Sequence, residues 1–256
     1  MDTLPTESEM ILALQSRGLF PADVRAARAW YNIAIASKLQ EIRDGSFATA
    51  VTARMSSWQK DYSQRFQLLT EPLSGEVRFV TKPFSSVVNK MFRQTILSAA
   101  PESFGFSDCF STFDDLVRVT LASPYGDGPK FLAAKLRELA DELKISRTVS
   151  ERANDFGYYA IHFTFDTPVE LLEFSRPNVV EVKLTGEIQL TTQLQLSLRT
   201  LTHKLYEVRR LTTNTNNEWK WDFSNELFRP SYTGHTLHLL ESLLLDMKNA
   251  EEQYNG

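Results

Sequence analysis

The chain has 256 residues, of which 42% are hydrophobic, and its formal net charge at pH 7 is −4. This length suffices for one sizeable core or for a core with a helical annex, and the acidic balance excludes nucleic-acid binding through a globally basic surface. The single cysteine, Cys109, excludes an internal disulfide and a cysteine-rich metal site. Residues 1–9 are unlike a signal peptide and no apolar run reaches membrane-spanning length, so we expect a cytoplasmic protein with no membrane partner.

The first quarter of the chain, from residue 6 to about residue 66, is predicted to be helical. Pro21 to Asp23 is a helix start signal, and apolar residues follow it at helical spacing. Gly45 interrupts this pattern, and a further helix is expected over residues 46–66.

A candidate phosphate-binding helix follows a short predicted strand over residues 77–80. Pro83 suits the first turn of a helix. Lys82, Ser86 and Lys90 are four positions apart, so they share one flank of this helix. Two ammonium groups, a hydroxyl group and a helix N-terminus would suit a polyphosphate, although such a flank is usually only solvated.

A second strand is predicted over residues 113–123, with two acidic residues, Asp114 and Asp115, at its head. Adjacent acids at a strand start are common in turns and helix caps, and they are also typical magnesium ligands. The pattern then predicts a turn over residues 124–128, a helix, and a polar connection over residues 147–156.

Residues 157–165 form the clearest strand pattern in the chain. With a period of two, Tyr159, Ile161, Phe163 and Phe165 point to a core, while Tyr158, Ala160, His162 and Thr164 point the other way. The second row would suit the wall of a nucleotide site, or it would simply meet water as the polar side of an antiparallel strand.

The remaining elements complete a mixed sheet flanked by helices. We expect a short helix or turn at residues 169–174, a hairpin pair over 179–192 that pivots near Gly186, and helices over 193–210 and 232–252. In the second half of the hairpin, Glu187 and Gln189 share one face. The predicted fold class is α+β with a mixed central sheet.

Five motifs in this order resemble the synthetase domain of the RelA/SpoT family of pyrophosphokinases, in particular its small alarmone synthetases and their toxin-like relatives. The resemblance covers roughly residues 75–210. It rests on Lys82, Ser86 and Lys90; on Asp115 and Leu116; on Gly157, Tyr158 and His162; on Glu187, Gln189 and Thr192; and on His203, Lys204 and Tyr206. No single motif is specific, but their order is. Three arginines of the family pattern are missing, because Val80, Thr120 and Thr191 stand at their positions.

The resemblance implies a central sheet of the RelA/SpoT nucleotidyltransferase type with helical extensions at both ends. It divides the chain into an N-terminal helical region (1–70), a pyrophosphokinase core (71–212) and a C-terminal helical extension (213–256). It also implies transfer of the β,γ-pyrophosphate of ATP to a ribose 3′-hydroxyl. Asp115 and Glu187 would be the catalytic and Mg²⁺-binding carboxylates, with Glu187 as general base.

The resemblance assigns further residues to the two substrates. Arg78, Lys82, Ser86 and Lys90 would bind the ATP phosphates. The acceptor would be bound by Tyr158, which would stack on its base, and by His162, Gln189, His203 and Lys204.

The sequence leaves three possible functions open. Because strand arginines are missing, the sequence favours a toxin-like enzyme that modifies the 3′-terminal adenosine of tRNA, blocks translation and has a small antitoxin partner. Its tRNA patch would comprise Arg25, Arg28, Lys204, Arg209 and Arg210. The alternatives are an alarmone synthetase acting on free guanosine or adenosine nucleotides, and a degenerate nucleotide sensor.

Overall fold

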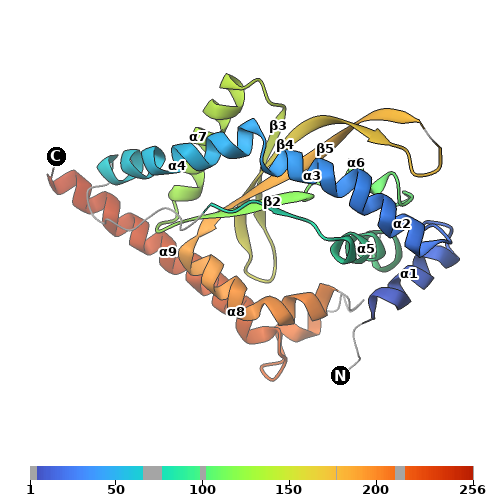
Figure 1. Cartoon of the computed structure of the whole chain (residues 1–256). Helices are drawn as coiled ribbons and strands as arrows, with labels where there is room; N and C mark the ends of the chain where they lie inside the picture. The colour runs from blue at the N-terminus through green and yellow to red at the C-terminus, as the bar shows by residue number, and fades with distance from the viewer. Residues whose placement is uncertain (1–4, 66–76, 99–101, 177, 211–216, 256) are drawn as a thin grey trace.

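A five-stranded mixed sheet forms the centre of the protein (Figure 1). The computed structural model describes residues 5–65, 77–98, 102–176, 178–210 and 217–255. The strand order is β1-β2-β5-β4-β3, and the α+β prediction is confirmed. The strands are β1 (Val80–Thr81), β2 (Val117–Ser123), β3 (Arg147–Ala153), β4 (Tyr159–Leu172) and β5 (Val179–Thr192).

The helices flank this sheet and lie at both ends of the chain. Those before β2 are α1 (Glu7–Ser16), α2 (Val24–Trp30), α3 (Ala36–Arg43), α4 (Ser46–Arg65), α5 (Phe84–Phe92) and α6 (Cys109–Thr112), with π-helical turns at Tyr31–Ile35 and Arg93–Leu97. Those after β2 are α7 (Gly128–Glu142), α8 (Gln193–Arg210) and α9 (Phe228–Asn255), with a 3₁₀ turn at Asn217–Lys220. The Asp23 side chain accepts a hydrogen bond from the Ala26 backbone and so caps α2, as its sequence position predicts.

Each central strand divides its side chains between a core face and a polar face. On β2, Val117, Val119 and Leu121 are buried in the hydrophobic core. Their neighbours Arg118 and Thr120 point to the opposite face because strand side chains alternate. The core face is packed against α4 and α7 and holds the fully buried Phe163 and Phe165 of β4, as predicted. The ring of Phe47 in α4 packs against both of these rings.

The structure corrects two predictions at the far edge of the sheet. Residues 147–156 are not a connection, because residues 147–153 form the edge strand β3, antiparallel to β4. Most of its side chains are polar, so no buried row marks it in the sequence. Residues 169–174 are not a helix or turn, because β4 continues to Leu172 through Pro168. Pairing with β3 ends at Phe165, so Pro168 lies where β4 is an edge and needs no donor on that side.

Gly186 is not the pivot of a hairpin. Residues 179–192 form one continuous strand, which pairs with β2 on one side and β4 on the other. Gly186 lies opposite Phe165, and a Cβ atom built at Gly186 would stand 2.4 Å from the Phe165 ring. The glycine therefore leaves the space that this fully buried ring occupies.

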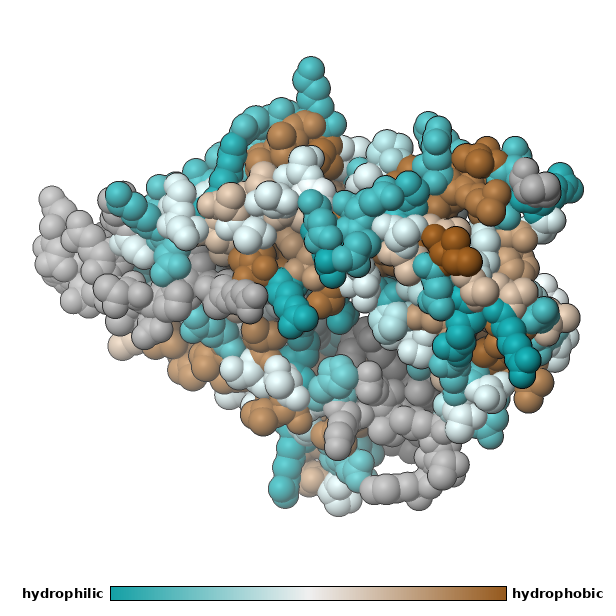
Figure 2. Space-filling view, in the orientation of Figure 1, coloured by the Kyte–Doolittle hydropathy of each residue, from teal (hydrophilic) through white to brown (hydrophobic). Residues whose placement is uncertain are grey.

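The last helix is longer than predicted and lies with the opposite side inward. Its buried face contains Ser231, Gly234, Glu241 and Lys248, and the Lys248 Nζ atom lies 2.6 Å from Asp127 Oδ2. Leu239, Leu240, Leu243 and Leu244, whose helical spacing in the sequence predicts the inward face of this helix, are instead exposed. Hydrophobic side chains are visible at the surface over α8 and α9 in Figure 2. Tyr159 belongs to this contact rather than to the core, because its ring stacks on His238 of α9.

The N-terminal helices and the sheet share one continuous hydrophobic core, which extends from Met10 to Leu190. The division into regions 1–70, 71–212 and 213–256 stays a prediction. None of the described helices combines the length and the hydrophobicity that a bilayer crossing requires.

Replacing Gly186 with alanine is predicted to destabilise the fold by about 1–3 kcal/mol, because the new methyl group overlaps the Phe165 ring in a packed core. Urea unfolding of the purified variant would measure this. Gly126→Ala is the control, since a Cβ atom there meets nothing within 4 Å. Equal free energies of unfolding for the two variants would contradict the explanation.

Candidate active site

Two strand pairings bring the candidate site residues to one polar face. The parallel pairing of β2 with β5 sets Arg118 opposite Glu187 and Thr120 opposite Gln189. The antiparallel pairing of β4 with β5 sets His162 opposite Gln189. These side chains line a cavity of about 980 Å³, which we call the larger cavity. Its wall also includes Lys90, Arg93, Asp114, Asp115, Arg152, Tyr158, Arg199 and His203.

Two lysines surround Asp115 at one end of the larger cavity. Lys82 Nζ lies 2.6 Å from Asp115 Oδ2, and Lys90 Nζ lies 2.8 Å from Asp115 Oδ1. The backbone N–H of Lys82 donates to the carbonyl of Leu116, which holds the start of α5 beside the head of β2. Lys90 also pairs with Asp114 at 2.7 Å.

Burial and charge act in opposite directions on this cluster. Burial alone would raise the pKa of Asp115, but Lys90 and Lys82 outweigh it and hold that pKa well below its usual range. Burial lowers the pKa of Lys82, while the neighbouring Asp115 acts against this change. The two lysines therefore favour the ionised form of Asp115.

A smaller cavity of about 640 Å³ adjoins the larger one and shares Arg93, Asp115, Arg118 and His203 with it. Lys82 and Ser86 line the smaller cavity, whereas Lys90 lines the larger one. The structure therefore sets these three side chains around the junction of the two cavities. Arg78 is not brought to them, since it lines a separate hollow beside Arg43.

A hydrogen-bonded chain crosses the opposite wall of the larger cavity. Tyr158 Oη lies 2.8 Å from His162 Nε2, and His162 Nδ1 contacts Glu187 Oε1. Gln189 Nε2 donates to the other oxygen of Glu187 at 3.2 Å. The side chain of Glu187 is only 4% exposed, so these contacts take the place of water around it.

Arg199 extends this chain and is the main residue that the sequence interpretation missed. It projects from α8, and its Nη1 donates to Gln189 Oε1 at 2.9 Å. Its Nη2 donates to Thr120 Oγ1 at 3.2 Å. Its only sequence signal is its place one helical turn before His203, and the resemblance gives that position no role. Arg118 and Arg152 also line the larger cavity and were not assigned to a substrate.

The remaining acceptor and tRNA candidates are only partly placed. His203 lines both cavities. Arg25 and Arg28 are exposed on α2, and Arg28 pairs with Glu7. The side chains of Lys204, Arg209 and Arg210 lie outside the described residues.

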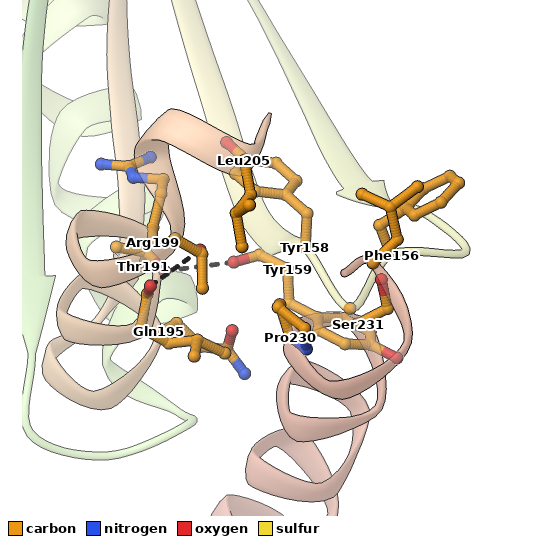
Figure 3. Close-up of a pocket in the computed structure, with 13 residues that line it drawn as sticks. Phe156, Tyr158, Tyr159, Thr191, Gln195, Arg199, Leu205, Pro230 and Ser231 are labelled. Atoms are coloured by element: carbon orange, nitrogen blue, oxygen red, sulfur yellow. Dashed lines mark hydrogen bonds between the residues drawn. The ribbon is translucent and has the colours of Figure 1, made fainter. Parts of the chain in front are cut away.

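A further hollow of about 70 Å³ lies on the far side of Tyr158, between the start of β4, α8 and α9 (Figure 3). Phe156, Leu198, Leu205 and Pro230 make its lining mostly apolar. Thr191 Oγ1 donates to the Tyr159 carbonyl at 3.1 Å across one wall. The guanidinium of Arg199 points away from Phe156 and Pro230, so its charged end belongs to the larger cavity.

The oxygen donors at the larger cavity fit a magnesium ion. Magnesium prefers oxygen ligands and often uses one or two protein carboxylates, while substrate phosphates and water complete its shell. Asp115 and Glu187 provide two carboxylates that line the same cavity. No group of three metal-ligating side chains gathers within the described ranges, which leaves the rest of such a shell to a bound substrate. The metal role of Asp115 and Glu187 stays a prediction.

Comparison with solved structures shows what this fold resembles. A GTP pyrophosphokinase family protein from Streptococcus pneumoniae is 18% identical, with a TM-score of 0.52, over 85% of this chain and 96% of that one. Small alarmone synthetase 1 from Bacillus subtilis is 15% identical, with a TM-score of 0.53, over 85% of this chain and 98% of that one. The chain has the fold of the small alarmone synthetases. No family model and no curated protein sequence matches it.

Replacing Asp115 with asparagine is predicted to lower the free energy of unfolding near pH 7 by about 1–3 kcal/mol, because Lys82 loses its charged partner and Lys90 loses one of two. The pKa of Asp115 is depressed in the folded protein, so its contribution is complete above the ordinary carboxyl pKa. The contribution falls as the pH drops below about 4.

Chemical denaturation of both proteins across this pH range measures the difference between them. The difference should shrink as the solution is acidified. Asp114→Asn is the matched control, since Asp114 is half exposed and pairs with Lys90 alone, and its effect should be smaller. A difference that stays constant down to the lowest pH at which both proteins fold would contradict the assignment.

Proposed function

We propose that this protein is a pyrophosphokinase that transfers the β,γ-pyrophosphate of ATP to the 3′-hydroxyl of a ribose. The observation that carries the proposal is the convergence of Asp115, which lies just before β2, and Glu187 of the paired strand β5 on one cavity with Lys90. Phosphoryl-group transfer needs positioned cations and carboxylates more than it needs covalent chemistry by the protein. The likeness to small alarmone synthetases supports the same activity.

In this proposal the donor lies at the junction of the two cavities. Lys82, Ser86 and Lys90 supply two ammonium groups and a hydroxyl group to the phosphates of ATP. A polyphosphate there would exchange places with the carboxylates that now pair with the lysines. Arg78 is left out of the donor site, because it lines a separate hollow.

Glu187 is the general base of the proposed reaction. The 3′ oxygen of the acceptor forms a bond to Pβ while the bond between Pβ and the bridging oxygen of AMP breaks, and the hydroxyl proton passes to Glu187. His162 and Gln189 each contact one oxygen of Glu187 and so hold the carboxylate in one orientation. A magnesium ion held by Asp115 and Glu187 would neutralise phosphate charge during the transfer.

The acceptor occupies the other end of the larger cavity. Tyr158 lines that end, and its hydroxyl group is held by His162. An aromatic ring held in this way suits stacking on a nucleobase. Gln189 and His203 complete the acceptor wall.

The charge of this wall favours a free nucleotide as the acceptor. The sequence favours tRNA because the strand arginines are missing, but Arg118, Arg152 and Arg199 supply guanidinium groups to the same cavity. Such groups suit the 5′-phosphates of a free nucleotide. Small alarmone synthetase 1 from Bacillus subtilis, which is 15% identical with a TM-score of 0.52, has been solved bound to its product pppGpp.

Transfer to the 3′-terminal adenosine of tRNA is the second candidate. Two observations favour it. Arg25 is exposed, and the arginines of the family pattern are replaced by Val80, Thr120 and Thr191. A toxic effect on translation and a small antitoxin partner belong to this candidate only.

Glu187→Gln is predicted to lower the rate of pyrophosphate transfer by at least about a hundredfold while ATP binding persists, because the amide can neither accept the proton nor bind the metal as a carboxylate does. Labelled ATP with GDP, resolved by thin-layer chromatography, measures the transfer. Glu181→Gln is the control on the same strand, since Glu181 is exposed and lines neither the larger nor the smaller cavity.

The same assay tests the sensor alternative. Binding of ATP by the wild-type protein without transfer to any nucleotide or to tRNA would refute the proposed enzyme and support a sensor. A Glu187→Gln variant with full activity would refute the assigned base.

The acceptor is decided by one competition. The wild-type protein is incubated with labelled ATP, total tRNA and GDP together. We expect the label in a small guanosine product, and we expect this product to depend only weakly on salt. Label confined to the tRNA band, falling steeply between low and physiological salt, would establish the second candidate, because phosphate contacts release counterions.

A further inference from the structure

Positively charged side chains around the two cavities differ in their partners. Lys82 and Lys90 are neutralised by Asp115, with Asp114 as a second partner of Lys90. Arg199 contacts only neutral groups, the amide oxygen of Gln189 and the hydroxyl of Thr120. Within the described part of the chain, no carboxylate lies within ion-pair distance of Arg199. A half-buried guanidinium without an acid beside it leaves a net positive charge on the cavity wall.

The contacts of Arg199 place this charge at a particular point. Its two terminal nitrogens end on Thr120 of β2 and Gln189 of β5, which are paired strand positions. Gln189 in turn donates to Glu187, the proposed base. The guanidinium of Arg199 is therefore separated from Glu187 by one side chain. It also contacts Thr120, which stands where the family pattern has an arginine.

We propose that Arg199 is a phosphate-binding arginine of the larger cavity, presented by helix α8 in place of an arginine missing from the strands. A guanidinium binds two phosphate oxygens through its planar fork, and both present partners are neutral acceptors that a phosphate would outcompete. This inference depends on the proposed function only in naming the molecule that carries the phosphate. The source of the phosphate is either the transferred group of ATP or the 5′-phosphate of the acceptor.

Binding of anions, measured by calorimetry without turnover, tests this assignment. The probes are inorganic pyrophosphate, ATP alone and GDP alone. Arg199→Gln should raise the dissociation constant for pyrophosphate and for at least one nucleotide by about tenfold or more, the change expected when a charge-assisted hydrogen bond is lost. Weakened ATP binding would identify the donor as the source, and weakened GDP binding would identify the acceptor.

Three comparisons separate charge from structure. Arg199→Lys keeps the charge without the fork and should bind pyrophosphate with intermediate affinity. Arg137→Gln removes the same charge from an exposed position of α7 and should change nothing. The Gln variant should unfold at the wild-type temperature, because glutamine can still donate to Gln189. Unchanged affinity of Arg199→Gln for all three probes would overturn the proposal.

A swap of the two side chains tests the position itself. The double variant Thr120→Arg, Arg199→Thr keeps the composition and net charge but presents the guanidinium from β2. It should regain most of the pyrophosphate affinity that Arg199→Thr loses. If the double variant folds but does not regain pyrophosphate affinity, Arg199 does not take the role of the missing strand arginine.

The two proposals fail in different ways. Loss of pyrophosphate binding in Arg199→Gln, together with a wild-type protein that transfers nothing, would refute the enzyme and leave the anion site standing. Full transfer by the wild type, together with unchanged pyrophosphate and nucleotide binding by Arg199→Gln, would support the enzyme and refute the anion site at Arg199.

Discussion

The parallel pairing of β2 with β5 is the constraint on which the rest of the structure depends. The two strands are far apart in the sequence, and a helix and two further strands lie between them. Their register sets Arg118 beside Glu187 and Thr120 beside Gln189 on one face. On the other face, Val119 and Ile188 enter the core. One hydrogen-bonded ladder thus fixes both the hydrophobic packing and the polar site, because strand side chains alternate.

The polar face has two halves with different electrostatics. In the first half, a carboxylate lies between two lysines, whose charges outweigh the effect of burial and lower its pKa. In the second half, the buried carboxylate of Glu187 contacts an imidazole and an amide, and the amide leads on to a guanidinium. The first half suits a highly charged polyphosphate, and the second suits a group that must gain a proton and position a nucleoside.

The sequence predicts the elements that carry a periodic signal and misses those that depend on tertiary contacts. The strand at residues 157–165 and the helix at 193–210 follow from their hydrophobic periods. Strand β3 has no buried row, and the role of Gly186 is visible only beside Phe165. Lys82, Asp115 and Glu187 belong to sequence motifs, so their proximity could be expected. Arg199 comes from another element, and no local pattern connects it to Thr120.

The pairing of Asp115 with Lys82 and Lys90 makes the two expected ligands of that region thermodynamically linked. A polyphosphate that takes the lysines releases the carboxylate, and a divalent cation that takes the carboxylate releases the lysines. Each ligand would therefore raise the affinity for the other. The two enhancement factors must be equal, since the coupling free energy between two binding events is reciprocal. The affinity for the nucleotide measured without the cation is thus lower than the affinity that the same side chains give when both ligands are present.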